Sequence, residues 1–232
     1  MLEPKKLSLF VTGTDTGVGK TLVTAALLHA LARHYPRVVG MKPVAAGTTQ
    51  IEGLDANDDV LALRAASNHR VPSELDNPVL LPDPVSPHIA AARAGVRIDI
   101  AHIAACHRAL MRQADAVVVE GAGGFMVPLS ATETGADLAQ ALGLPVVLVV
   151  GLRLGCLNHA LLTAEAIRAR GLALAGWVAN HIDPDMLAQT DNIAFLQQQL
   201  AAPLLASIAH QPQPAPQTLN LELPLAWRST PH

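Results

Sequence analysis

The chain has 232 residues, of which 50% are hydrophobic and 15% charged, and its formal net charge is −3. A chain of this length and apolar content can bury the core of one α/β domain. The negative charge and the 3% aromatic content disfavour contact with phosphate backbones and stacked bases, so we expect no nucleic-acid partner.

Short β-branched runs alternate along the chain with longer segments of helical period. Strands are expected at 7–12, 38–42, 116–120, 146–150 and 174–180. Helices are expected at 21–33, 58–66, 99–113, 135–142 and 156–170. Four of the strands are almost continuously apolar, which indicates burial on both faces. The pattern predicts a three-layer α/β fold with a central, mostly parallel sheet and helices on both faces.

Two segments break this alternation. Residues 68–87 are rich in proline and polar residues, and five further prolines follow Pro203, so we expect irregular surface chain in both places. The sequence shows no linker and no internal repeat. We predict one domain over residues 1–232 with an irregular, proline-rich tail at about 209–232.

The cysteines and the longest apolar run indicate the cellular setting. Cys106 and Cys156 lie far apart without metal-ligand spacing, as expected in a reducing cytoplasm. The apolar run 144–152 is about half the length of a membrane span. Ten histidines show no paired ligand spacing, so no zinc site is predicted. We expect a soluble cytoplasmic protein with no membrane partner.

A glycine-rich loop follows the first predicted strand. It reads Gly13-Thr14-Asp15-Thr16-Gly17-Val18-Gly19-Lys20-Thr21 and leads into a helical pattern. Such a loop wraps phosphates with its backbone N–H groups, while Lys20 reaches the outer oxygens and Thr21 offers its hydroxyl to Mg²⁺. Thr14 stands where the first glycine is usual, with Gly13 one residue earlier. The alternative is a glycine turn followed by an accidental Gly-Lys-Thr.

Ligands of parallel sheets bind beyond the carboxyl ends of the strands, where Lys42, Glu120, Gly151 and Asn180 are expected. A carboxylate at the end of a buried strand is costly without a cation, so Glu120 should have a metal or ammonium partner. Lys42 is kept out of a helix by Pro43 and is a candidate electrostatic catalyst. The alternatives are a glutamate that reaches solvent and an exposed lysine.

Two predicted helix starts carry further candidates. The acidic run 55–59 is explained by helix capping, or else Asp59 turns inward and joins Thr21 and Glu120 around Mg²⁺. The helix start at 155–158 leaves free N–H groups suited to a carboxylate, whereas Cys156 itself is expected to pack in the core.

Together these motifs resemble the dethiobiotin synthetase family, which has the P-loop NTPase fold. The matching segments, in chain order, are 11–21, 42–44, 86–88 (Ser-Pro-His), 119–124, 155–159 and 176–180. The resemblance implies a ligase of biotin biosynthesis that converts 7,8-diaminononanoate, CO2 and MgATP into dethiobiotin, ADP and phosphate. A carbamate and a carbamic–phosphoric anhydride would be the intermediates.

The resemblance also implies residue roles and a homodimer with active sites at its interface. The catalytic group is Lys42, Lys20 and Thr16. The Mg²⁺ shell is Thr21, Asp59 and Glu120. The substrate-binding residues are Lys42, Ala46, Gly155, Cys156, Leu157 and Asn158. The ATP-binding residues are Gly17, Val18, Gly19, Lys20, Thr21, Leu22, Asp59, Glu120, Gly121, Ala122, Gly123, Asn180, His181, Ala209, His210 and Gln211.

Two positions depart from the family pattern. Ala46 stands near the substrate where serine or threonine is common, and residues 209–211 are not diagnostic, which leaves nucleotide selectivity open. One rival class, the partitioning ATPase switches, carries a second lysine five residues before the invariant one, where this chain has Asp15. Another, the amidotransferase-coupled corrin synthetases, needs an added glutaminase domain that 232 residues cannot accommodate.

Overall fold

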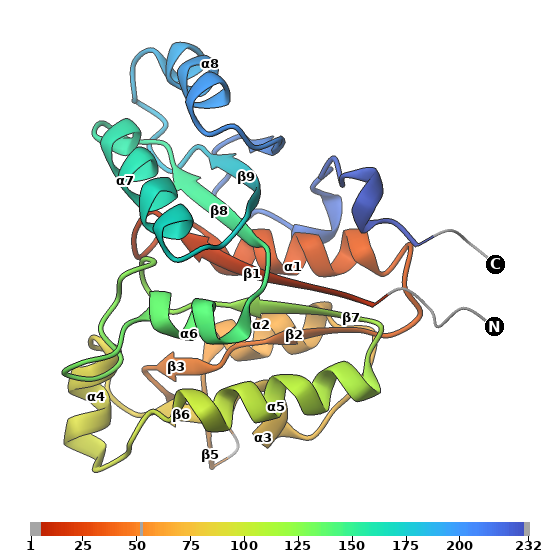
Figure 1. The fold of residues 1–232 in the computed structure, drawn as a ribbon, viewed down its shortest axis with the longest axis vertical. Helices are drawn as coiled ribbons and strands as arrows, with labels where there is room; N and C mark the ends of the chain where they lie inside the picture. The colour runs from red at the N-terminus through yellow and green to blue at the C-terminus, as the bar shows by residue number, and fades with distance from the viewer. Residues whose placement is uncertain (1–5, 52, 230–232) are drawn as a thin grey trace.

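The computed structural model describes residues 6–51 and 53–229, and its centre is a six-stranded sheet in the order β10-β9-β8-β1-β7-β2 (Figure 1). Every pairing in this sheet is parallel. The strands are β1 (Leu7–Gly13), β2 (Val38–Met41), β7 (Ala116–Glu120), β8 (Val146–Gly151), β9 (Leu174–Asn180) and β10 (Leu204–Ile208). Leu9, Val118 and Val147 in its middle are fully buried, which explains the apolar runs.

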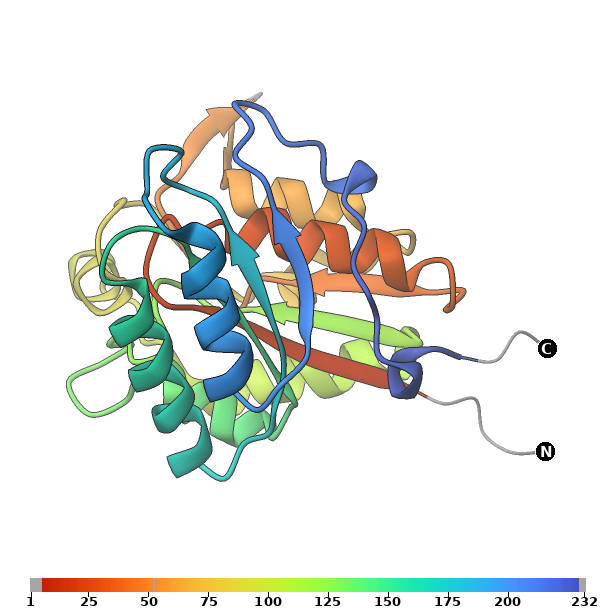
Figure 2. The same ribbon diagram turned by 90° about the horizontal axis from the view of Figure 1, so that it is seen from above.

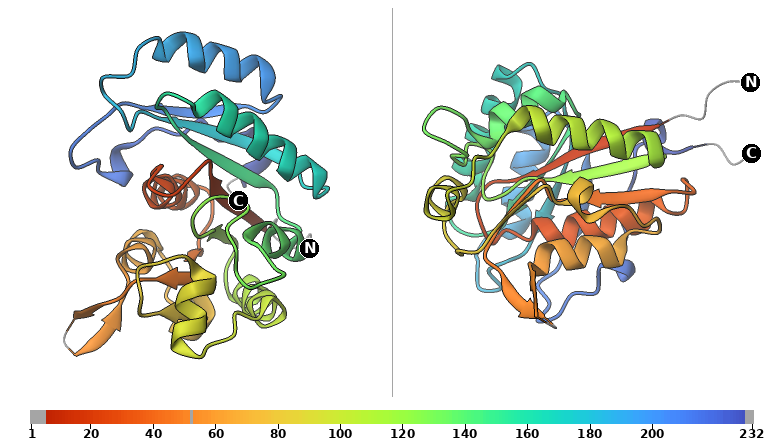
Figure 3. Two further views of the ribbon diagram at one scale, coloured as in Figure 1. Left: turned by 90° about the vertical axis from the view of Figure 1, so that its left-hand side faces the viewer. Right: turned by 90° about the horizontal axis from the view of Figure 1, so that it is seen from below.

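Helices cover both faces of the sheet, as Figure 3 shows from two sides. The α-helices are α1 (Lys20–Leu31), α2 (Asp58–Ala66), α3 (Ser73–Asp76), α4 (Pro87–Ala94), α5 (Ile100–Gln113), α6 (Gly135–Leu142), α7 (Cys156–Ala169) and α8 (Gln189–Gln199). Helices α1 and α2 share one buried cluster with the sheet, whereas α5, α6, α7 and α8 pack on the opposite face. The predicted α/β fold with helices on both faces is confirmed.

Two small sheets lie beyond the main one. Strands β3 (Val44–Ala46) and β6 (Val79–Leu81) pair in parallel, and β4 (Thr49–Ile51) pairs antiparallel with β5 (Leu54–Ala56). Strand β3 begins three residues after β2 ends, so it extends the chain past the carboxyl edge of the main sheet. This additional layer supplies one wall of the cleft described below.

The five predicted strands and five predicted helices are all present, but two segments expected to be irregular are regular in part. Residues 68–87 contain α3 and β6, and the segment after Pro203 begins with β10. Among the described residues, strand β10 pairs only with β9, and an edge strand tolerates small and polar residues such as Ala206 and Ser207. Helix α8 buries fully only Leu196, so its apolar period was too weak to read.

The end of the described chain packs along α1 (Figure 2). Of the tail predicted to be irregular at about 209–232, residues 230–232 lie outside the described chain. Residues 209–229 contain only two short 3₁₀ turns, η1 (Pro216–Thr218) and η2 (Leu225–Trp227). Leu221, Leu223 and Trp227 nevertheless join the cluster around α1. Irregular backbone therefore still contributes to the core here. Among residues 6–51 and 53–229, no helix combines the length and apolarity needed to cross a bilayer.

Candidate active site

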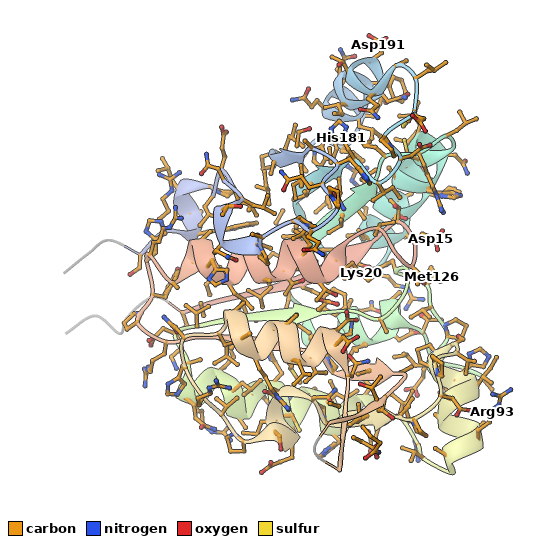
Figure 4. All side chains as sticks on the ribbon, turned by 180° about the vertical axis from the view of Figure 1, so that it is seen from behind. Asp15, Lys20, Arg93, Met126, His181 and Asp191 are labelled. Atoms are coloured by element: carbon orange, nitrogen blue, oxygen red, sulfur yellow. The ribbon has the colours of Figure 1, made fainter. Side chains whose placement is uncertain are left out.

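The glycine-rich loop turns the chain directly from β1 into α1. Gly17 and Gly19 adopt left-handed backbone angles (φ 74° and 90°), which side chains rarely allow. No side chain caps the start of α1, so its first N–H groups are left for another acceptor. Figure 4 shows Asp15 and Lys20 at this helix start. The loop therefore has the geometry of an anion site at a helix N-terminus.

Lys20 is buried in this loop, at the start of α1. Its Nζ donates to the carbonyl oxygen of Asp15 at 2.9 Å, and only 7% of the residue is exposed. Burial, followed by repulsion from the Lys42 ammonium, lowers the pKa of Lys20 to about 8. The loop therefore holds an ammonium group that an incoming anion would stabilise.

Four more side chains converge beside Lys20 from four parts of the chain. Lys42 Nζ donates to Glu120 Oε1 at 2.5 Å and to Asp59 Oδ2 at 2.8 Å. The Thr21 hydroxyl lies 2.7 Å from Asp59 Oδ1 and 3.0 Å from Glu120 Oε1. In the sequence these residues lie after β1 (Thr21), after β2 (Lys42), in the first turn of α2 (Asp59) and at the end of β7 (Glu120). The parallel sheet brings them to one edge.

The buried pair decides between the alternatives left open for Lys42 and Glu120. Glu120 is 0% exposed and Lys42 4% exposed, so neither side chain extends into solvent. Burial alone would lower the pKa of Lys42, but attraction by Glu120 and Asp59 outweighs it and raises that pKa above its usual value. Lys42 thus stays an ammonium inside the site.

Both arrangements considered for residues 55–59 occur, on different residues. Asn57 is the cap of α2, because its side chain accepts from the N–H groups of Asp59 and Val60 at 3.1 and 3.3 Å. This leaves the Asp59 carboxylate free to face Lys42 and Thr21. Burial would raise the pKa of Asp59, but Lys42 outweighs this effect and lowers it, so the group is a carboxylate.

The same residues fit a magnesium ion shared with phosphates and water. Within the described chain, Glu120 Oε2 is buried with no hydrogen-bond partner, which leaves a carboxylate oxygen available. Thr21 and Asp59 add two hard oxygen donors close by. No group of three or more histidine, cysteine or acidic residues that could hold a metal occurs among residues 6–51 and 53–229.

A cleft of about 430 Å³ opens from this cluster between the main sheet and the added β3 layer. Lys42, Asp59 and Thr16 form its polar end. Its remaining lining residues are apolar or small, with one hydroxyl: Val44, Ala46, Pro84, Val85, Ser86, Pro87, Ala122, Gly123 and Val127. The cleft can hold a molecule that has one charged or polar end and an apolar body.

A second pocket, of about 170 Å³, lies on the other side of the glycine-rich loop. Six of the predicted ATP-binding residues line it together: Leu22, Asn180, His181, Ala209, His210 and Gln211. Asn180 Nδ2 donates to the carbonyl of Val18 at 2.9 Å, and a Cβ on Gly19 would lie 2.2 Å from this nitrogen. The end of β9 therefore braces the loop and borders the pocket. Figure 4 shows His181 between Lys20 and α8, marked by Asp191.

The predicted substrate residues 155–158 do not line either pocket. They form the start of α7, with Gly155 in a left-handed conformation (φ 95°), Gly155 and Asn158 exposed and Cys156 buried. The packing role expected for Cys156 agrees with this burial. Their contact with substrate stays a prediction.

Several residues of the site were missed at the sequence level. Arg153 forms an ion pair with Asp15 in the glycine-rich loop, and Val44 and Val127 line the cleft. Pro84 and Val85 also line it, from the segment expected to be irregular surface chain. The Ser-Pro-His motif directly after them was the available signal. Valines and prolines in loops carry no chemical signature of their own.

Comparison with known proteins places the chain in a family. A family model described as AAA domain matches residues 8–218. A ParA family ATPase from Chlorobium tepidum TLS shares the fold, with 13% identity, 89% of this chain and 85% of that chain covered, and a TM-score of 0.54. The septum site-determining protein MinD complexed with Mg-ADP from Pyrococcus horikoshii OT3 also shares it, with 19% identity, 90% of this chain and 82% of that chain covered, and a TM-score of 0.53. These identities support the fold alone. The chain belongs to the AAA domain family matched here, which includes dethiobiotin synthetase, and has a P-loop NTPase fold.

Proposed function

We propose that this chain is an ATP-dependent dethiobiotin synthase, which carboxylates 7,8-diaminononanoate with CO2 and closes the ureido ring. One observation carries the proposal: Lys20 and Lys42 point into one site with Thr21, Asp59 and Glu120, at the polar end of a cleft with apolar walls. A diamine with an alkyl chain matches this distribution of polar and apolar surface. The family match is compatible with this activity.

In the proposed reaction, one amine of the diamine loses a proton and captures CO2 as a carbamate. A carbamate oxygen attacks the γ-phosphorus of ATP and ADP leaves, which forms a carbamic–phosphoric anhydride. The second amine then attacks the carbonyl carbon, and phosphate leaves as the ring closes. Lys20 and Lys42 would offset the negative charge on the carbamate and the transferred phosphoryl group, which is the main requirement of such a transfer.

Thr21, Asp59 and Glu120 would hold Mg²⁺, and the bound ion would neutralise charge on the phosphate oxygens. Thr16 lies on the cleft wall, where its side chain would face the transferred group. The apolar lining would limit the access of water to the anhydride. Leu22, Asn180, His181 and residues 209–211 would contact the base of ATP from the second pocket.

Two parts of the proposal rest on the family resemblance. The start of α7 at 155–158 would receive the substrate carboxylate across the interface of a homodimer, because a helix N-terminus without a side-chain cap suits an anion. Ala46 lines the cleft without a hydroxyl, so this chain would lack one hydrogen bond to the substrate. A cytoplasmic location belongs to the same proposal.

A nucleotide-driven partitioning switch is the competing function, because its fold is shared. The position of its second lysine is taken by Asp15, whose carboxylate accepts from Thr16 N at 2.7 Å and pairs with Arg153. An acidic side chain there cannot supply the positive charge that this lysine would bring. This observation favours the synthase.

The test combines purified protein, MgATP, bicarbonate and 7,8-diaminononanoate and follows ADP and dethiobiotin together. We expect ADP release that depends on the diamine and equals ring formation, and its loss in Lys42→Ala. Lys6→Ala is the matched control, because Lys6 is exposed and lies at the opposite end of β1. ATP hydrolysis unaffected by the diamine, in a protein that binds nucleotide, would instead favour the switch.

A further inference from the structure

Strand β2, which leads to Lys42, is one of the two edge strands of the main sheet, opposite β10. Three alternate N–H groups on its outer side are nevertheless hydrogen-bonded, by loop and short-helix residues instead of a strand. The donor and acceptor pairs are Val38 N to Asn68 Oδ1 (2.6 Å), Gly40 N to Ser67 Oγ (2.9 Å) and Lys42 N to Asp76 O (2.8 Å). The chain between α2 and α3 therefore covers this edge and reaches as far as Lys42.

Both backbone groups of Lys42 are held by two consecutive residues at the end of α3. Its N–H donates to the carbonyl of Asp76, and its carbonyl accepts from Asn77 Nδ2 at 2.7 Å. The same amide nitrogen lies 3.3 Å from the Val79 carbonyl oxygen. The place where the lysine side chain starts is thus determined by residues 76 and 77.

An ion pair anchors this support. Asp76 is 5% exposed, and Arg64 donates to both of its oxygens, through Nε at 2.8 Å and through a terminal nitrogen at 2.5 Å. Helix α3 has only four residues and cannot hold its position by its own hydrogen bonds. Arg64 belongs to α2, whose first turn carries Asp59, the partner of the Lys42 ammonium. The backbone and the carboxylate partner of Lys42 are therefore tied to each other.

We propose that Asp76, held by Arg64, is a positioning residue that fixes the Lys42 ammonium between Asp59 and Glu120. Its kinetic consequence rests on the proposed function, whereas its effect on the placement of Lys42 does not. Displacing a reacting or stabilising group by about 1 Å can reduce a rate on the order of a hundredfold. Loss of the ion pair should therefore reduce turnover without removing any group from the cleft.

The other end of the same strand offers a matched control. Arg37, just before β2, donates to both oxygens of Asp115 at 3.0 and 2.7 Å, and Asp115 is also 5% exposed. Asp115 precedes β7, so this pair lies at the amino edge of the sheet, away from the site. Asp76→Asn and Asp115→Asn therefore remove the same charge from equally buried carboxylates, each of which accepts two hydrogen bonds from an arginine.

A spectroscopic test uses the fact that the chain has only four lysines, Lys5, Lys6, Lys20 and Lys42. Protein labelled with ¹³C and ¹⁵N at lysine should give few side-chain signals, and loss of one in Lys42→Arg assigns Lys42. We expect the Lys42 signal to shift or broaden in Asp76→Asn and to stay unchanged in Asp115→Asn. An unchanged Lys42 signal in Asp76→Asn would refute the positioning role, whatever reaction the protein catalyses.

Kinetics give the second readout. We expect kcat for dethiobiotin formation to fall at least about tenfold in Asp76→Asn, with KM for ATP within about twofold and Asp115→Asn like the wild type. Equal kcat in the two variants would overturn the proposal. If the wild type forms no dethiobiotin, the proposed function fails and the lysine spectrum alone decides. If Asp76→Asn does not fold, the lysine spectrum and kcat are measured for Arg64→Lys, with Arg37→Lys as its control. Each of these variants keeps the positive charge but loses the two parallel hydrogen bonds to the carboxylate.

Discussion

Replacing Lys20 by methionine should stabilise the nucleotide-free protein, although it should abolish tight ATP binding. The pKa of Lys20 falls from 10.5 to about 8 in the folded state, mainly through burial. At about 1.4 kcal/mol per pKa unit, the charged side chain costs folding about 3 kcal/mol at neutral pH. Loss of its hydrogen bond to Asp15 offsets about 1 kcal/mol of this. We expect a net gain of about 2 kcal/mol from Lys20→Met.

The pH dependence distinguishes this cause from a general packing effect. Because the folded pKa lies below the unfolded one, the wild type carries the full cost below pH 8 and loses it as the pH rises from about 8 to 10.5. The advantage of Lys20→Met should therefore shrink over that range. Urea unfolding followed by circular dichroism at pH 7 and 9.5 measures both values, with Lys6→Met as the exposed control. A variant less stable than the wild type at pH 7, or a gain independent of pH, would refute the reasoning.

Two further predictions concern other buried ionisable groups. Lys42→Met should destabilise the protein by about 3–5 kcal/mol in urea unfolding, because it leaves the fully buried Glu120 without its cation. Adding Glu120→Gln should recover much of this loss. A loss of stability below about 1 kcal/mol in Lys42→Met would contradict the prediction. Burial and Arg108 lower the pKa of His107 to about 4, so stability should fall as the pH drops from about 6.5 to 4, by up to about 3 kcal/mol more than in His107→Gln. Parallel acid-unfolding curves of these two proteins would argue against that cost.

Much of the architecture could be predicted because burial leaves a direct pattern in the sequence. The strand Val146–Gly151 is buried at every position, so its run of apolar residues could be read without the structure. Helix α5 has an apolar face that includes Ile103 and Leu110, which gives a clear helical period. Helix α8 and strand β10 lie at the margin of the fold, where partial exposure removes both signals.

The site could be predicted only where chemistry or topology restricts the choice of residue. The sharp turn at Gly17 and Gly19 requires left-handed backbone angles, so the loop appears as a glycine pattern. Glu120 was unusual because a carboxylate ended an apolar strand. The apolar wall of the cleft could not be found in this way, because Val44 and Val127 resemble any core residue and come together only through the tertiary fold.

The support of Lys42 shows why positioning residues are harder to find than catalytic ones. The atom of Asp76 that accepts from Lys42 is its backbone carbonyl, which every amino acid possesses, and its carboxylate acts only by holding Arg64. Neither contact requires a recognisable spacing along the chain. Both contacts are required because β2 lies at an edge of the sheet. Its outer N–H groups need partners, and the lysine that follows must start from a fixed point. Residues of this kind are identified by asking where each backbone group of a functional side chain finds its hydrogen bond.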